Sequence, residues 1–216
     1  MEIKDLLKQK HNWRKMGRDL CRKLGIELWA GSPKFSELEY LFSVLEIEKP
    51  KRVLSCGMGC TTKILNYHKP EVFVAVENKP PKVSEAFDEH GNEVTGPWKE
   101  NIEKLEKEIP NLIRYENWRE VNGTYDCFFL DSSAGINGWE GCRQHHRHDC
   151  LCYAMPLLRN NALVIVHDYQ CRINQQVDKI LESFYFKFVD KFCGIGVFRI
   201  CKKWWLERGS PKKKHK

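Results

Sequence analysis

The most informative residues are a glycine-containing segment and the acidic residue that follows it. Residues 55–62 read Ser-Cys-Gly-Met-Gly-Cys-Thr-Thr and follow a short apolar run. Gly57 and Gly59 would let a ligand approach the backbone, and a helix starting near residue 63 would add free N–H groups and partial positive charge. Glu77 ends the next apolar run, where a carboxylate can accept hydrogen bonds from ribose hydroxyls. This pattern predicts a nucleotide-binding site.

Ionisable residues also end two later apolar runs. Asp131 follows residues 125–130, and His167 and Asp168 follow residues 162–166. Because the C-terminal ends of parallel strands face the ligand crevice of an open α/β sheet, we expect these side chains beside a bound ligand. They are candidates for removing a proton from a substrate; the alternatives are a structural histidine and a helix-capping aspartate. The two carboxylates could also hold a divalent cation that acidifies a hydroxyl group.

Residues 142–150, Cys-Arg-Gln-His-His-Arg-His-Asp-Cys, form the most unusual segment. Two pairs of its histidine, aspartate and cysteine residues are spaced four apart, which would suit a zinc ion on one face of a helix. The favoured interpretation is an exposed loop in which Arg143 and Arg147 bind a carboxylate or phosphate of the substrate. A solvated helix face is the third alternative.

The order of the surrounding elements predicts an α/β fold. Helices are expected over residues 3–24 and from Ser32-Pro33 to Lys49. Continuous apolar runs that suit buried parallel strands follow at residues 52–54, 72–76, 112–115, 125–130 and 162–166. Helices are expected between them at residues 63–67 and 98–108, and over about 15 residues ending near Leu158. This alternation favours a mostly parallel sheet with helices on both faces.

Two segments depart from the alternation. Residues 79–97 contain Pro80-Pro81, Gly91-Asn92 and Gly96-Pro97, so a long loop is expected there. Residues 186–192 and 197–201 are apolar segments separated only by Gly194-Ile195-Gly196, which predicts a β-hairpin.

With these motifs in place, the chain resembles class I S-adenosylmethionine (SAM)-dependent methyltransferases over about residues 35–201. Residues 57–62 look like their G-x-G-x-[ST]-T variant, whereas the third glycine of a dinucleotide motif is absent. Tyr125-Asp126 with Leu130-Asp131 is similar to their fourth-strand motif. Residues 161–169 resemble the fifth strand of small-molecule and sugar O-methyltransferases, and the plant glucuronoxylan methyltransferase-like group is the nearest.

The resemblance implies a Rossmann-like methyltransferase fold, with a mostly parallel seven-stranded sheet, a C-terminal antiparallel hairpin and an N-terminal helical extension. The expected boundaries are residues 1–46 for the extension, 47–201 for the SAM-binding domain and 202–216 for a basic tail. SAM is the implied cofactor. The implied cofactor-binding residues are Gly57, Met58, Gly59, Cys60, Thr61, Thr62, Glu77, Asn78 and Asp131. Asp131, His167 and Asp168 would be catalytic.

One position departs from the pattern of the superfamily, which usually has an acid two residues before the first glycine. Ser55 occupies that position here. The acid normally helps to hold the amino group of the methionine part of SAM. Because of this departure, a second alternative stays open: the chain could be a catalytically degenerate binding protein with a methyltransferase fold.

Composition and charge narrow the remaining function classes. No window offers the roughly 18 apolar residues of a membrane helix, and the N-terminus lacks an apolar signal region, so we expect a cytoplasmic protein with reduced cysteines. The net charge is +7, with +5 on residues 1–25 and +6 on residues 202–216. We therefore expect O-methylation of a small molecule or saccharide, with an RNA methyltransferase that uses its basic termini as the alternative.

Overall fold

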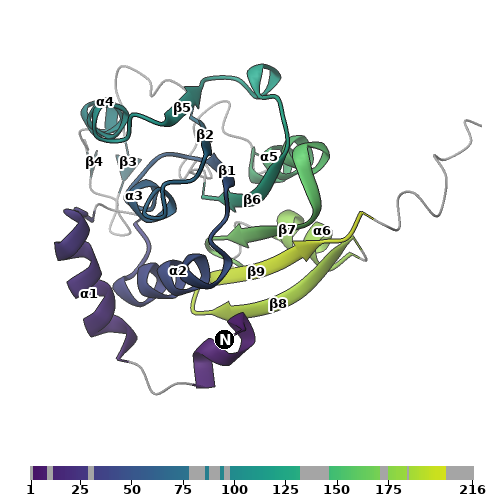
Figure 1. Ribbon diagram of the computed structural model, residues 1–216, viewed down its shortest axis with the longest axis horizontal. Helices are drawn as coiled ribbons and strands as arrows, with labels where there is room; N and C mark the ends of the chain where they lie inside the picture. Colours follow the sequence, from purple (N-terminus) through teal and green to yellow (C-terminus); the bar gives the residue numbers. More distant parts are fainter. Residues whose placement is uncertain are drawn as a thin grey trace, which may run out of the picture.

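The computed structural model describes residues 2–8, 12–28, 32–77, 86–87, 93–94, 98–131, 146–170, 175–183 and 185–202. Its centre is a seven-stranded sheet with the order β5-β2-β1-β6-β7-β9-β8 (Figure 1). The strands are β1 (Arg52–Cys56), β2 (Val72–Val76), β5 (Leu112–Tyr115), β6 (Tyr125–Leu130), β7 (Leu158–Val166), β8 (Phe186–Phe192) and β9 (Ile195–Ile200). Two-residue strands β3 (Ala86–Phe87) and β4 (Glu93–Val94) pair separately.

Helices cover both faces of this sheet. The helical elements are η1 (Ile3–Lys8), α1 (Trp13–Leu24), α2 (Phe35–Glu48), α3 (Thr62–Leu65), α4 (Trp98–Glu108), η2 (Trp118–Glu120), α5 (His146–Ala154), η3 (Met155–Leu157) and α6 (Gln175–Leu181). Alternate strand residues point to opposite faces. Accordingly, Phe129 packs in the core beneath α1 to α4, and its neighbour Phe128 packs in the core beneath α5 and α6.

The strand order reverses at β1. Strand β1 pairs in parallel with both β2 and β6, and the connections run in opposite directions on the two sides of β1. Ligands of open α/β sheets bind at such a point, outside the C-terminal ends of the strands. Strands β8 and β9 add an antiparallel hairpin on β7. The predicted mostly parallel sheet with a C-terminal hairpin is confirmed.

Three predicted elements differ from the structure. The single helix over residues 3–24 is wrong: a 3-10 helix ends at Lys8, and α1 begins after Asn12, whose side chain accepts a hydrogen bond from Lys15 N. The segment 79–97, expected as a long loop, contains the β3–β4 pair. This pair was not predicted because a strand of two residues is too short to show a periodic pattern in the sequence. Helix α5 ends at Ala154, since Pro156 restricts the preceding residue and favours the short 3-10 turn that leads into β7.

The N-terminal helices share the core of the sheet. Helix α2 continues two residues beyond the expected boundary at residue 46, and Leu38, Leu41 and Leu45 are buried in the same cluster as strand residues such as Phe73. The expected extension is therefore packed as part of the domain. Of the expected tail, residues 203–216 lie outside the described residues. Among the helices that are described, none combines the length and apolar character needed to cross a membrane.

Candidate active site

The glycine turn after β1 is held by hydrogen bonds from both sides. Gly57 has φ = 101°, a conformation that favours glycine, and its N–H donates to Val76 O at the end of β2 over 3.0 Å. The buried Ser55 hydroxyl donates to Gly57 O over 2.9 Å. Gly59 N donates to the Thr62 hydroxyl over 3.0 Å, and a Cβ built on Gly59 would meet no atom of the described residues within 4 Å. The turn thus combines a fixed backbone with open space beside one glycine.

Glu77 follows β2 and lies against this turn. Its Oε2 accepts a hydrogen bond from Met58 N over 2.7 Å, which ties the end of β2 to the centre of the turn. Its own N–H donates to Tyr115 O, which extends the pairing with β5. Asn78, the next expected cofactor residue, lies outside the described residues.

The other expected turn residues are mostly inaccessible to solvent. Met58, Thr61 and Thr62 are buried, and burial raises the pKa of the Cys60 thiol to about 12. A thiol with such a pKa stays protonated at neutral pH and is a poor nucleophile. Cys60 can therefore line a ligand site but is not a reactive group.

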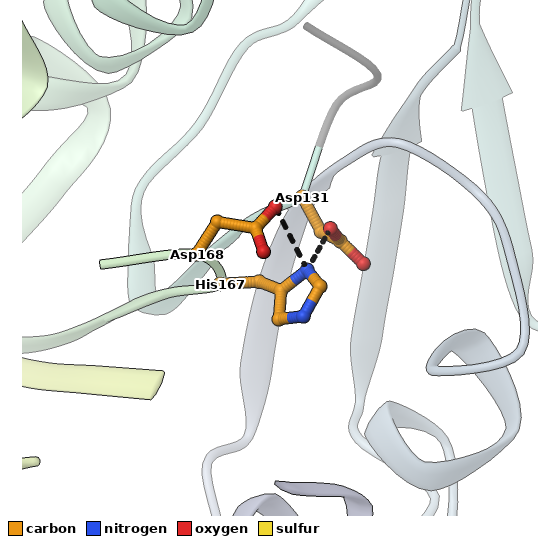
Figure 2. A group of neighbouring side chains, drawn as sticks. All are labelled: Asp131, His167 and Asp168. Carbon is orange, nitrogen blue, oxygen red and sulfur yellow. Dashed lines mark hydrogen bonds and ion pairs between the residues drawn. The ribbon is translucent and has the colours of Figure 1, made fainter. Parts of the chain in front are cut away.

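The three expected catalytic residues meet at the ends of β6 and β7. His167 Nδ1 lies 2.7 Å from Asp131 Oδ1 and 3.5 Å from Asp168 Oδ2, and Figure 2 shows both interactions as dashed lines. The backbone fixes this arrangement, because Asp131 N donates to Cys56 O and His167 N donates to Leu130 O. We call Asp131, His167 and Asp168 the strand-end cluster. It adjoins the glycine turn through the pairing of β1 with β6.

A fourth carboxylate reaches His167 from the N-terminal helices. Glu37, in the first turn of α2, places its Oε2 3.6 Å from His167 Nε2. The same oxygen accepts from Lys34 N over 2.6 Å, and Oε1 accepts from Gly194 N over 3.1 Å in the β8–β9 turn. The imidazole therefore has carboxylates at both of its nitrogens.

Arg147, in the first turn of α5, adds a buried cation to the cluster. Its Nη1 donates to the carbonyl oxygen of His167 over 2.9 Å. Its Nη2 lies 3.3 Å from Asp168 Oδ2 and 3.6 Å from Asp131 Oδ1. The side chain is only 5% exposed, so the expected exposed loop is wrong for this residue. Arg143 lies outside the described residues.

These contacts decide the charge of His167. Burial alone would lower its pKa, but the charge and hydrogen bond of Asp131, together with Glu37 and Asp168, raise the pKa to about 10. Burial acts to raise the pKa of Glu37, yet His167 and two backbone N–H groups outweigh that effect and lower it. At neutral pH the pair of His167 and Glu37 is therefore an imidazolium facing an ionised carboxylate.

Comparisons with known proteins agree with this architecture. No protein-family model and no curated protein matches the sequence. Solved structures do match. An O-methyltransferase from Bacillus cereus in complex with S-adenosylhomocysteine (SAH) is 12% identical, with a TM-score of 0.52 over 92% of this chain and 94% of that chain. A methyltransferase from Geobacter sulfurreducens is 14% identical, with a TM-score of 0.53 over 91% and 92%.

The chain has the Rossmann-like fold of class I methyltransferases. A SAM complex of a Streptomyces achromogenes O-methyltransferase also shares it, at 9% identity and a TM-score of 0.52 over 89% of this chain and 91% of that chain. At such low sequence identities the likeness establishes only the fold, so the function has to be argued from the residues of the site.

The sequence analysis did not predict that Glu37 belongs to the site or that Arg147 is buried in it. Glu37 is the third residue of α2, a position where a glutamate commonly bonds back to the N-cap N–H, and its bond to Lys34 N is of this kind. That signal predicts a cap but not a contact with a histidine 130 positions later. Arg147 was expected to bind substrate, and nothing in its local sequence indicates that it turns inward.

Proposed function

We propose that this chain is a SAM-dependent methyltransferase that acts on an oxygen atom of a small molecule or saccharide. One observation carries the proposal: the glycine turn, Glu77 and the strand-end cluster lie together at the C-terminal ends of β1, β2, β6 and β7. That edge is where ligands bind in open α/β sheets. Two solved structures of the same fold hold SAH or SAM, which supports this choice of cofactor.

The turn and Glu77 would bind different parts of the cofactor. Residues 57–62 would lie along the methionine part, where Gly59 leaves space for close approach. Glu77 would accept hydrogen bonds from the ribose hydroxyls, and Asn78 would lie beside the adenine. Asp131 would face the sulfonium, whose positive charge a carboxylate complements.

The strand-end cluster would then handle the acceptor proton. Methyl transfer is an in-line displacement, in which a protein positions the two reactants and helps to deprotonate the acceptor. An imidazolium cannot accept a proton, so His167 would act by holding Asp131. Asp168 would take the hydroxyl proton, because its carboxylate is 34% exposed whereas that of Asp131 is 19% exposed and bonded to His167.

Calorimetric titration of the full chain with SAM and SAH, with NADH as a control, tests the cofactor. We expect micromolar binding of both adenosyl ligands and none of NADH. Glu77→Ala should weaken SAM binding at least tenfold, about the effect of losing a charge-assisted hydrogen bond of 1.5 kcal/mol or more. Glu120→Ala, on the surface 3-10 helix η2, is the matched control and should bind as the unmodified chain does.

The opposite results of these titrations would contradict parts of the proposed function. No binding of SAM or SAH would contradict the proposal and favour the degenerate binding module, since the buried Ser55 already uses its hydroxyl on Gly57 O. Unchanged SAM binding by Glu77→Ala would remove Glu77 from the cofactor site. An acceptor screen with sugars, uronic acids and phenols would follow a positive titration.

An RNA acceptor is a second candidate, because α1 carries many exposed cations. They are Arg14, Lys15, Arg18, Arg22 and Lys23. Phosphate contacts through such residues make binding fall steeply with salt. Fluorescence anisotropy with a structured RNA at two salt concentrations tests this candidate, and absent or salt-insensitive binding would remove it.

A further inference from the structure

We propose that the guanidinium of Arg147 is the resident cation of the strand-end cluster, and that it keeps divalent metal ions out of this site. The inference rests on the proposed function only where it concerns methyl transfer, which would then need no metal ion. The exclusion of metal is a property of the cluster itself and can be measured without an acceptor.

The cluster has the donor set of a metal site. One ligand atom each from Asp131, His167 and Asp168 lies within 4.8 Å of the others. Two carboxylates and an imidazole at adjoining strand ends would suit a divalent cation such as Mn²⁺ or Zn²⁺. The residues of the cluster alone therefore match the expectation that a cation could acidify a hydroxyl there.

Arg147 does not fit that metal. Its Nη2 lies 3.3 Å from Asp168 Oδ2 and 3.6 Å from Asp131 Oδ1, and these atoms belong to the same two carboxylates that a metal would use. A cation about 2.0–2.5 Å from both carboxylates would lie roughly 5 Å or less from Nη2. A guanidinium never loses its charge in a protein, and the Arg147 side chain is only 5% exposed, so water would screen the repulsion between the two cations poorly.

Arg147 is also anchored against displacement. Its second nitrogen, Nη1, donates to the carbonyl oxygen of His167 over 2.9 Å, and the side chain is only 5% exposed. A metal ion would have to break this hydrogen bond and leave a buried guanidinium without its carboxylates, which is strongly unfavourable. Arg147 therefore occupies the cation position from within the fold.

Titration of the full chain with Mn²⁺, followed by electron paramagnetic resonance of the free ion, tests the exclusion. We expect only weak Mn²⁺ binding by the unmodified chain, and we expect Arg147→Met to bind Mn²⁺ at least tenfold more tightly. Arg147→Lys, which keeps a cation, is the matched control and should stay at the unmodified level. Asp131→Asn added to Arg147→Met should abolish the gain.

Two results would overturn the inference. One is a single micromolar Mn²⁺ site in the unmodified chain that Asp131→Asn removes. The other is an Arg147→Met protein with a native circular dichroism spectrum and no gain in Mn²⁺ affinity. Should Arg147→Met fail to fold, the titration of the unmodified chain decides. The separate SAM titration shows whether the proposed function fails independently of these outcomes.

Discussion

The buried imidazolium of His167 predicts an unusual pH dependence of stability. Its pKa is about 10 in the folded chain, against an ordinary value of 6.5. A group whose pKa is raised by folding stabilises the folded state fully below its unfolded pKa, and this stabilisation is lost as the pH rises towards the folded pKa. The chain should therefore lose stability from about pH 6.5 upwards, through the neutral and mildly alkaline range.

The size of the effect follows from the raised pKa. One pKa unit corresponds to about 1.4 kcal/mol, so the full contribution of His167 is roughly 5 kcal/mol, of which about 2.5 kcal/mol should disappear between pH 7 and pH 9. His167 is 5% exposed, so solvent screening reduces this value little. For a domain with a typical stability of about 5–15 kcal/mol, the loss is readily measured.

Urea unfolding of the unmodified chain and of His167→Gln at pH 6, 7, 8 and 9 isolates this contribution. Glutamine stays neutral and can still donate to Asp131. Burial also raises the pKa of the Cys60 and Cys127 thiols, so both proteins should lose stability at alkaline pH. Their difference cancels the thiols and should shrink by about 2.5 kcal/mol from pH 7 to pH 9. A difference that stays constant with pH would show that the imidazole is neutral and refute the charge assignment.

Three glycine substitutions give further predictions. Gly57→Ala should destabilise the chain by about 1–3 kcal/mol in urea unfolding, because φ is 101° there, and should also abolish SAM binding. Gly59→Ala should keep the unmodified melting temperature and yet weaken SAM binding in calorimetry, since its Cβ enters the open space beside the turn; unchanged binding would place the cofactor elsewhere. Gly17→Ala should lower the melting temperature by several degrees, because its Cβ would lie 1.8 Å from Phe35 O and push α1 away from α2; an unchanged melting temperature would contradict this packing.

The sheet was predictable because its strands are continuous apolar runs. Residues 72–76 were expected as a strand and form β2 with the same bounds. The hairpin followed from the short glycine connection at Gly194. Elements that depend on a few residues were not predictable in this way: the apolar spacing of residues 3–24 continues across the cap at Asn12, and the strands β3 and β4 have only two residues each.

The site was predictable where topology alone places a residue. Asp131, His167 and Asp168 end parallel strands, so their proximity follows from strand order. Glu37 and Arg147 come from helices, and the direction in which a helical side chain points depends on how that helix packs. A charged residue in the first turn of a helix is usually a solvated or capping residue, so neither position showed in advance that it would be buried against His167.

Glu37 changes how the N-terminal helices relate to the proposed chemistry. Glu37 gives one oxygen to the β8–β9 turn at Gly194 N and the other to the His167 imidazolium and Lys34 N. Without it, His167 would lose the anion at Nε2 and Asp131 would face a less firmly held cation. Helix α2 thus contributes to the electrostatics of the site, because the charge of His167 depends on Glu37 from α2 as well as on Asp131 after β6.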